Sequence, residues 1–159
     1  GRSGIDRVQD TAADANEEDR SLMRAGLHLG IVVDEHRVDF ERGDFLVRNV
    51  LGADRAAGAI AVGDEVPVGS TIQFQVRDAA SADDDLRALL AGRVAAGALV
   101  FTCNGRGTHF FDRPDHDAEL VSDHVRESAV GGMFCAGEVG PIGGRSFLHG
   151  FTASILLFS

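Results

Sequence analysis

The sequence contains no lysine, tryptophan or tyrosine, and its 159 residues include only two cysteines and three prolines. All 15 basic residues are therefore arginines, and they face 25 acidic residues, which gives a formal net charge of -10 at pH 7. A surface of this charge repels polyphosphates, so we expect no general binding of nucleic acids. Small ligands remain open as partners.

The two cysteines, Cys103 and Cys135, each lie in an apolar run and lack the close pairing of a zinc ligand set. A chain of this length buries a core without disulfides or a metal, so we expect a reducing compartment, no metal site and no cofactor. The longest apolar segments, residues 94–105 and 146–159, fall short of the roughly 18 to 20 residues of a membrane-spanning helix. The first residues lack the hydrophobic stretch of a signal peptide, so a cytoplasmic protein without membrane contact is expected.

Residues 1–21 are polar and acidic, and we expect them to form a mobile leader or linker. The folded domain is then expected over residues 22–159. Its first half contains strand candidates at residues 27–32, 45–52, 58–66 and 70–78. Residues 70–78 alternate apolar and polar side chains, which is typical of a half-buried strand. Turn residues separate the last three segments, which predicts an antiparallel meander.

The second half alternates helix and strand signals. Residues 81–94 open with Ser81 as a cap candidate and three aspartates, followed by leucines at helical spacing. Residues 98–103 predict a strand buried on both faces, and a second helix is expected from its cap Asp112 to Val125. Strands are expected at residues 129–136 and 149–158. This order indicates an α+β domain whose mixed, largely antiparallel sheet has two main helices packed mainly on one face.

The segment CNGRG, residues 103–107, follows the buried strand. Its backbone N–H groups can form an anion-binding nest, and Arg106 can grip a carboxylate or phosphate. The spacing matches no Walker A motif. The alternative is a tight turn whose arginine faces solvent.

The segment GEVGPIGGRSFLHG, residues 137–150, places Glu138, Arg145 and His149 among glycines and one proline. Such a segment suits a rigid rim around a pocket, because glycine lets the backbone approach a ligand and proline stiffens the loop. The alternative is a buried ion pair between Glu138 and Arg145 that only anchors the loop.

Several chemistry-bearing residues also have a plain structural interpretation. His109 and His149 lie beside phenylalanines, where a hydrogen-bonded structural histidine is the more common case. Cys103 would need one of these histidines as a base to act as a nucleophile, and Cys135 is more typical of a small core residue. The acidic residues at 83–85 and 115–119 suit helix starts better than a metal site.

Four stretches together resemble the carboxy-terminal half of FIST domains: FLVRNVLGAD from Phe45, AIAVGDEVPVGSTIQFQVRD from Ala59, FTCNGRG from Phe101, and FCAGEVGPIGGRSFLHGFTASILLF from Phe134. FIST domains are sensory modules of bacterial signalling proteins and of some eukaryotic F-box proteins. The resemblance runs from about Phe45 to the last residue. It implies an amino-terminal FIST half, in the same or in a partner chain, as a partner.

The resemblance also implies small-molecule sensing, with amino acids or their derivatives as the ligand class, and it brings no catalytic residue with it. A zwitterion needs a guanidinium or a nest for its carboxylate and an acid for its ammonium group. We therefore expect a ligand pocket formed by Asn49, Cys103, Asn104, Gly105, Arg106, Glu138, Gly143, Gly144, Arg145 and His149. Two alternatives stay open. One is a cysteine-dependent hydrolase or transferase that uses Cys103 with His109 or His149, and the other is an interaction module whose glycine-rich loop docks onto a partner without any ligand.

Overall fold

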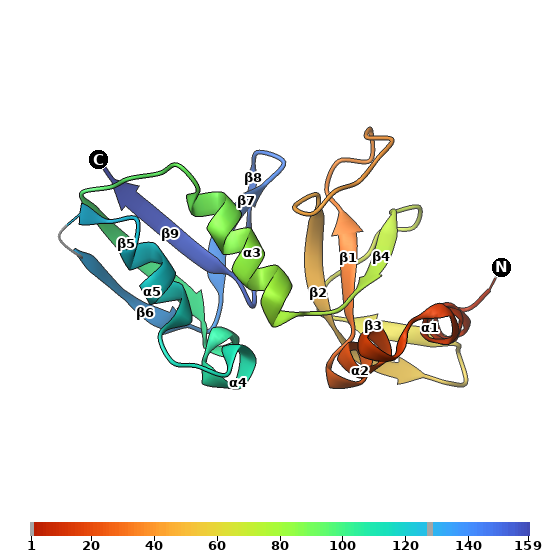
Figure 1. The fold of residues 1–159 in the computed structure, drawn as a ribbon. Helices are drawn as coiled ribbons and strands as arrows, with labels where there is room; N and C mark the ends of the chain where they lie inside the picture. The colour runs from red at the N-terminus through yellow and green to blue at the C-terminus, as the bar shows by residue number, and fades with distance from the viewer. Residues whose placement is uncertain (1, 127–128) are drawn as a thin grey trace. The chain divides into compact units, whose positions relative to one another are not determined.

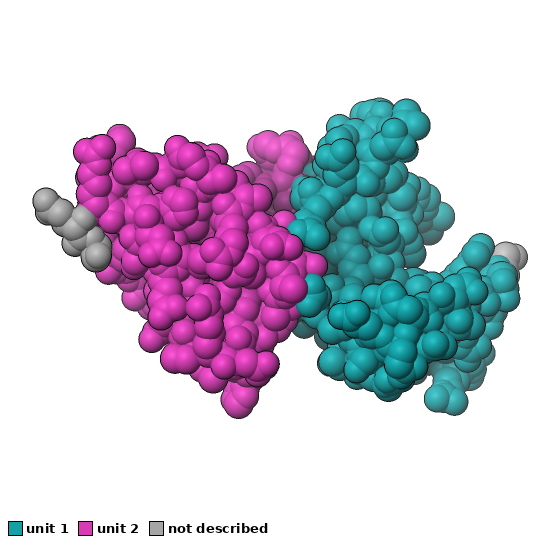
Figure 2. Space-filling model, viewed as in Figure 1, with its two compact units in different colours: residues 1–78 teal, residues 79–159 magenta. Residues whose placement is uncertain are grey.

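The computed structural model describes residues 2–126 and 129–159. The chain divides into two compact units, residues 1–78 and residues 79–159, which Figure 2 shows in different colours. The division falls within residues 22–159, which were expected to form one domain. The predicted α+β class is confirmed, and each unit is described by itself below.

The first unit is built on a four-stranded antiparallel sheet (Figure 1). Its strands are β1 (His28–Val32), β2 (Phe45–Asp54), β3 (Ala59–Val62) and β4 (Ile72–Gln75), in the order β3-β2-β1-β4. The predicted meander was therefore wrong for β4, which pairs with β1 instead of β3. All five residues of β1 are buried, and a buried strand needs neighbours on both edges to satisfy its backbone groups.

Two short helices precede this sheet, α1 (Gly4–Asp14) and α2 (Glu17–Ala25). Ser3 caps α1 through a reciprocal capping box with Asp6, and the Asn16 side chain caps α2. Residues 1–21 were expected to form a mobile leader or linker, and Gly1 among them lies outside the described residues. The scarcity of large apolar residues there favours disorder, whereas the capping residues Ser3 and Asn16 favour helices.

The second unit contains a mixed three-stranded sheet, a hairpin and most of the helical turns. Its elements are α3 (Ala79–Leu90), β5 (Gly97–Cys103), the 3₁₀ turn η1 (Asn104–Arg106), α4 (Thr108–Phe111), α5 (His116–Ser122), β6 (Val130–Cys135), β7 (Glu138–Ile142), β8 (Arg145–His149) and β9 (Ala153–Phe158). Strand β5 is central, with β6 parallel on one side and β9 antiparallel on the other. Strands β7 and β8 form a separate antiparallel hairpin.

Helices α3 and α5 lie along one face of the β5-β6-β9 sheet, as Figure 1 shows. Their buried leucines and valines meet the inward side chains of β5 to form the core: Leu86, Leu90, Ala98, Val100, Leu120 and Val121. The prediction that β5 is buried on both faces was wrong, because helices cover only one face and Leu99 on the other is 37% exposed.

Two predicted helix starts were displaced. Helix α3 begins at Ala79, so Ser81 lies within its first turn and is not its cap. The cap of α5 is Asp115, whereas Asp112 ends α4 in the left-handed conformation with a φ of 54°. Pro114 thus precedes α5, because the chain first completes the short helix α4.

Two adjacent glycines of β6 provide a matched test of the sheet. A Cβ atom at Gly132 would overlap the backbone carbonyl oxygen of Val100 on β5, whereas one at Gly131 would meet only a Leu99 methyl group at 3.6 Å. We expect Gly132→Ala to lower the free energy of unfolding by more than about 3 kcal/mol, since backbone must move. Gly131→Ala should change it by less than about 1 kcal/mol. Urea unfolding of both variants measures the difference, and equal effects would contradict the described β5–β6 pairing.

Candidate functional site

A pocket of about 230 Å³ opens in the second unit where β5 ends and α5 begins. Charged and polar groups from η1 and α5 lie on one side, and apolar side chains from β5 and β6 lie on the other. The lining residues are Val100, Thr102, Arg106, Asp115, His116, Asp117, Ala118, Val130, Gly131, Gly132, Met133 and Phe134.

The Asp117 carboxylate forms the centre of the polar side and is 3% exposed. Its Oδ2 accepts hydrogen bonds from Thr102 Oγ1 at 2.6 Å and Arg106 Nε at 2.8 Å. Its Oδ1 accepts one from Arg106 Nη2 at 2.8 Å and lies 3.0 Å from His116 Nδ1. Arginine and carboxylate thus form a bidentate pair, the arrangement that best compensates the removal of both charges from water.

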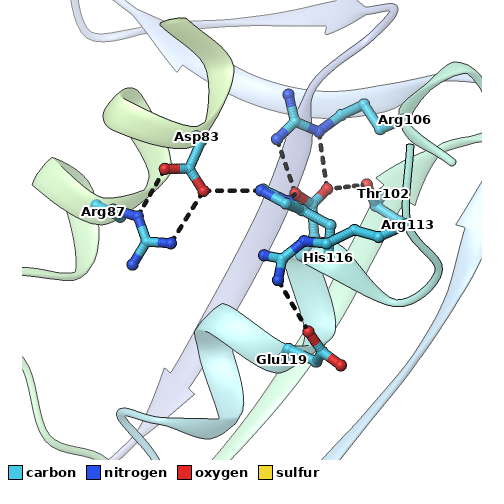
Figure 3. Close-up of polar contacts among 8 residues, drawn as sticks. Asp83, Arg87, Thr102, Arg106, Arg113, His116 and Glu119 are labelled. Carbon is cyan, nitrogen blue, oxygen red and sulfur yellow. Dashed lines mark hydrogen bonds and ion pairs between the residues drawn. The ribbon is translucent and has the colours of Figure 1, made fainter. Parts of the chain in front are cut away.

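His116 links this pair to α3. Its ring stacks on Phe111 with centroids 3.5 Å apart and planes 4° from parallel, and its Nε2 lies 2.8 Å from Asp83 Oδ1. Asp83 in turn accepts two hydrogen bonds from Arg87, as Figure 3 shows. Each ring nitrogen of His116 thus lies within hydrogen-bonding distance of a carboxylate, and the row of polar contacts runs from α3 to η1.

These contacts shift the two carboxylates toward their charged forms. Burial alone would raise the pKa of Asp117, but the hydrogen bonds from Arg106 and Thr102, the Arg106 charge and the contact with His116 outweigh it and hold the pKa below its ordinary value. The hydrogen bond from Arg87 lowers the pKa of Asp83, with a smaller contribution from His116.

One terminal nitrogen of Arg106 is not used by Asp117. Nε and Nη2 are bonded to Asp117, whereas Nη1 has no hydrogen-bond partner among the described residues (Figure 3). The guanidinium also lies over the Phe111 ring, 5.1 Å from its centroid. The exposed Asp115 carboxylate belongs to the same pocket lining. The pocket thus offers a fixed cationic donor, an accessible acid and an apolar wall.

Among the described residues, only one of those predicted to form a ligand pocket, Arg106, lines the pocket beside α5. It is 8% exposed, so the alternative of a solvent-facing arginine was wrong. The turn past Cys103 lies beside the segment that joins the hairpin to β9, because the Phe151 ring fills the space beside Gly105 and Cys103 N donates to Thr152 O at 2.9 Å.

Glu138 lies at the base of the hairpin and is 2% exposed. Its Oε2 accepts hydrogen bonds from Thr152 N at 3.2 Å and Thr152 Oγ1 at 2.9 Å, whereas Oε1 is buried without a partner among the described residues. Arg145 is the register partner of Ile142 near the hairpin tip. Ile142 lies four residues, or roughly 13 Å, along β7 from Glu138. The ion pair proposed between Glu138 and Arg145 is not among the contacts of the described chain, and Arg145 lies over Phe147 instead.

The other predicted residues are dispersed. Gly143 and Gly144 form the hairpin turn with φ of 55° and 77°, and His149 Nε2 lies 2.9 Å from Gly140 O, which fits the structural interpretation of this histidine. Asn104 is exposed in η1. Asn49 belongs to the first unit, where its Oδ1 accepts from Arg77 Nη2 at 3.3 Å.

Four residues of this site were not predicted: Thr102, Asp117, His116 and Asp83. A threonine within an apolar strand was a usable signal, because its buried hydroxyl needs a partner. The sequence DHDAE, residues 115–119, fits a helix start or a metal patch, and neither interpretation predicts a buried Asp117. In the described residues, Cys103 Sγ makes no hydrogen bond to His109 or His149, and no group of three or more metal-binding side chains is present.

Comparison with known proteins identifies the family. Residues 5–141 match the FIST C domain, and the chain belongs to this family, whose members are sensory domains of signal-transduction proteins.

Longer mycobacterial proteins are similar over nearly the whole chain. The uncharacterized protein Mb0898c of Mycobacterium bovis is 49% identical over 165 aligned positions, which cover 99% of this chain and 42% of that protein. The uncharacterized protein Rv0628c of Mycobacterium tuberculosis is 48% identical, with 99% and 43% covered. The chain spans about two fifths of the length of these relatives.

No solved structure matches the chain. Among the helices of the described residues, none has the length and apolar character needed to cross a membrane.

Asp117→Asn tests the central ion pair. The change leaves the Arg106 charge buried without its counter-charge, so we expect the free energy of unfolding at neutral pH to fall by about 3 kcal/mol. Asp115→Asn is the matched control, because Asp115 is exposed two residues away and makes no side-chain cap hydrogen bond. Urea unfolding compares the two, and equal small losses would contradict a structural role for the pair.

The contribution of Asp117 to the free energy of unfolding should depend on pH. Because the folded pKa of Asp117 lies below the ordinary value of 3.8, its contribution to stability is complete above pH 3.8 and is lost as the pH falls through the folded pKa. The stability gap between the wild type and Asp117→Asn should therefore narrow on acidification below pH 3.8. Unfolding curves at a series of pH values measure it, and a constant gap would speak against a charged Asp117.

Proposed function

We propose that this chain is a ligand-sensing FIST C domain that binds an amino acid or a derivative in the pocket beside Arg106. The observation that carries the proposal is the Nη1 donor of Arg106, which has no partner among the described residues although the arginine is buried and held bidentately, in the lining of a pocket that also includes an exposed carboxylate. A small zwitterion presents the matching pair of charges.

The size of the pocket supports a small metabolite. Its volume of about 230 Å³ lies below the roughly 300 to 1,000 Å³ typical of pockets for drug-sized ligands. An amino acid fits this scale better than a nucleotide or a peptide.

Rigidity of the arginine supports recognition of a carboxylate. Asp117 fixes the guanidinium from one side and Phe111 packs on its face, so little conformational freedom is lost when Nη1 donates to a ligand. Asp117 also neutralises much of the Arg106 charge, and a zwitterion therefore suits the site better than a multiply charged anion.

Two other parts of the pocket would contact the ammonium group and the side chain of the ligand. Asp115 is the acid available for an ammonium group, while Val100, Val130 and Phe134 provide apolar contacts for a side chain. The wider set predicted from the sequence, with Glu138, Arg145 and Asn49, remains a separate prediction. Access of a ligand to Glu138 would require the buried base of the hairpin to open.

We also propose a partner and a cellular location for this chain. We propose an amino-terminal FIST half, in the same or a partner chain, as its partner, supported by the family membership and by the greater length of the relatives. A cytoplasmic location is proposed on the basis that both cysteines are free thiols.

Isothermal titration calorimetry with the twenty amino acids tests the ligand class. For any that binds, Asp115→Asn should weaken affinity about tenfold, because it removes a charge-assisted hydrogen bond to the ammonium group. Asp112→Asn is a close control: both aspartates are exposed with φ of 54°, a conformation that asparagine tolerates, and Asp112 is absent from the pocket lining. The pocket assignment fails if no amino acid binds or if the two variants bind equally.

Two further variants distinguish this pocket from the site predicted around the hairpin. Glu138→Gln and Arg145→Ala, measured in the intact protein with both FIST halves, should leave affinity unchanged if the ligand lies beside Arg106. A loss of binding in both, with normal binding by Asp115→Asn, would move the site to the hairpin.

A further inference from the structure

The two cysteines of the chain lie opposite each other on neighbouring parallel strands. Cys103 is the last residue of β5 and Cys135 the last residue of β6, and their Cα atoms are register partners. In-register residues of adjacent strands point to the same face of a sheet. These are the only two cysteines in the sequence, and both are free thiols.

The spacing of the strands permits a bond between them. Neighbouring strands lie about 4.8 Å apart, which falls within the range of about 4.4 to 6.8 Å between Cα atoms in disulfides. The Cβ atoms of such neighbours are separated by about the same distance, slightly more than the roughly 3.5 to 4.5 Å of a relaxed disulfide. A bond would therefore draw the two strand ends together and would be readily reduced.

The two thiols differ in access. Cys103 is 8% exposed, whereas Cys135 is half-buried on the edge strand β6. Cys135 is thus the thiol that an oxidant reaches first, and Cys103 lies beside it as the resolving thiol.

We propose that Cys103 and Cys135 form a reversible dithiol–disulfide site that responds to a peroxide. The Cys135 thiolate attacks one peroxide oxygen, the O–O bond breaks, and the products are a sulfenic acid and water or an alcohol. The Cys103 thiol then attacks the sulfenic sulfur, an S–S bond forms, and the hydroxyl group leaves with the thiol proton as water. In total, two thiols are oxidised, one peroxide is reduced, and a cellular or added dithiol reverses the reaction.

The location gives the bond a structural consequence. Thr102 and Phe134 immediately precede the two cysteines, and both line the pocket on the opposite face of the sheet. Oxidation would thus tie together the two strand ends that frame the pocket. The thiol chemistry itself does not depend on the proposed ligand.

Hydrogen peroxide added to the reduced, purified chain tests the site. We expect intact mass to show the loss of two hydrogen atoms per chain in a monomer, peptide mapping to join the peptides of Cys103 and Cys135, and dithiothreitol to restore both thiols. Disulfide-linked dimers, or separate oxidation of each cysteine to a sulfinic acid without a joined peptide, would overturn the proposal.

Single variants test the order in which the two thiols react. In Cys103→Ser, a dimedone adduct should form on Cys135, whereas Cys135→Ser should react with peroxide at least about tenfold more slowly, because the buried thiol remains. Equal rates would overturn the assigned roles.

A second reagent tests the proximity of the thiols without any substitution, so that a misfolded variant cannot affect the result. Phenylarsine oxide, which bridges two adjacent thiols, should bind the wild-type chain in a one-to-one adduct. Failure to bind would contradict the proximity of the thiols.

Discussion

The second unit depends on the ion pair between Asp117 and Arg106. Both groups are buried, and a buried charge without a partner costs several kcal/mol, roughly 3 to 5 kcal/mol when one member of a pair is removed. Asp117 therefore has to lie within hydrogen-bonding distance of Arg106 and Thr102 at once. This requirement fixes α5 against the end of β5 and the turn that follows it.

The same constraint prepares the pocket. Because two nitrogens of Arg106 are held by Asp117, the orientation of the third is determined before any ligand arrives. His116 continues the network to Asp83 and thereby connects the pocket to α3. A ligand that displaced Arg106 even slightly would disturb contacts along this whole row, which is a physical route by which a sensory domain can transmit occupancy.

Local patterns were sufficient to predict many elements but not their partners. The leucine spacing predicted α3, and the apolar run ending at Cys103 predicted β5, because each depends on neighbours in sequence. The pairing of β4 with β1 joins segments more than 40 residues apart in the sequence, which no local pattern shows. Gly143-Gly144 between alternating residues was a signal for a two-residue hairpin turn, yet the many glycines favoured a loop interpretation. The Thr102–Asp117 contact joins residues 15 positions apart and became visible only once α5 packed on β5.

The alternation of strand side chains separates two kinds of chemistry in this unit. Thr102 faces α5, where it bonds to Asp117, so the next residue, Cys103, faces the other side of the sheet. A nucleophilic Cys103 could not act on a ligand held beside Arg106, and a cysteine-dependent enzyme would need a second site on the opposite face. The pocket and the thiol pair thus share strands β5 and β6 without sharing a surface. Any coupling between them must pass through the strand backbone, where a small shift at one face is necessarily a shift at the other.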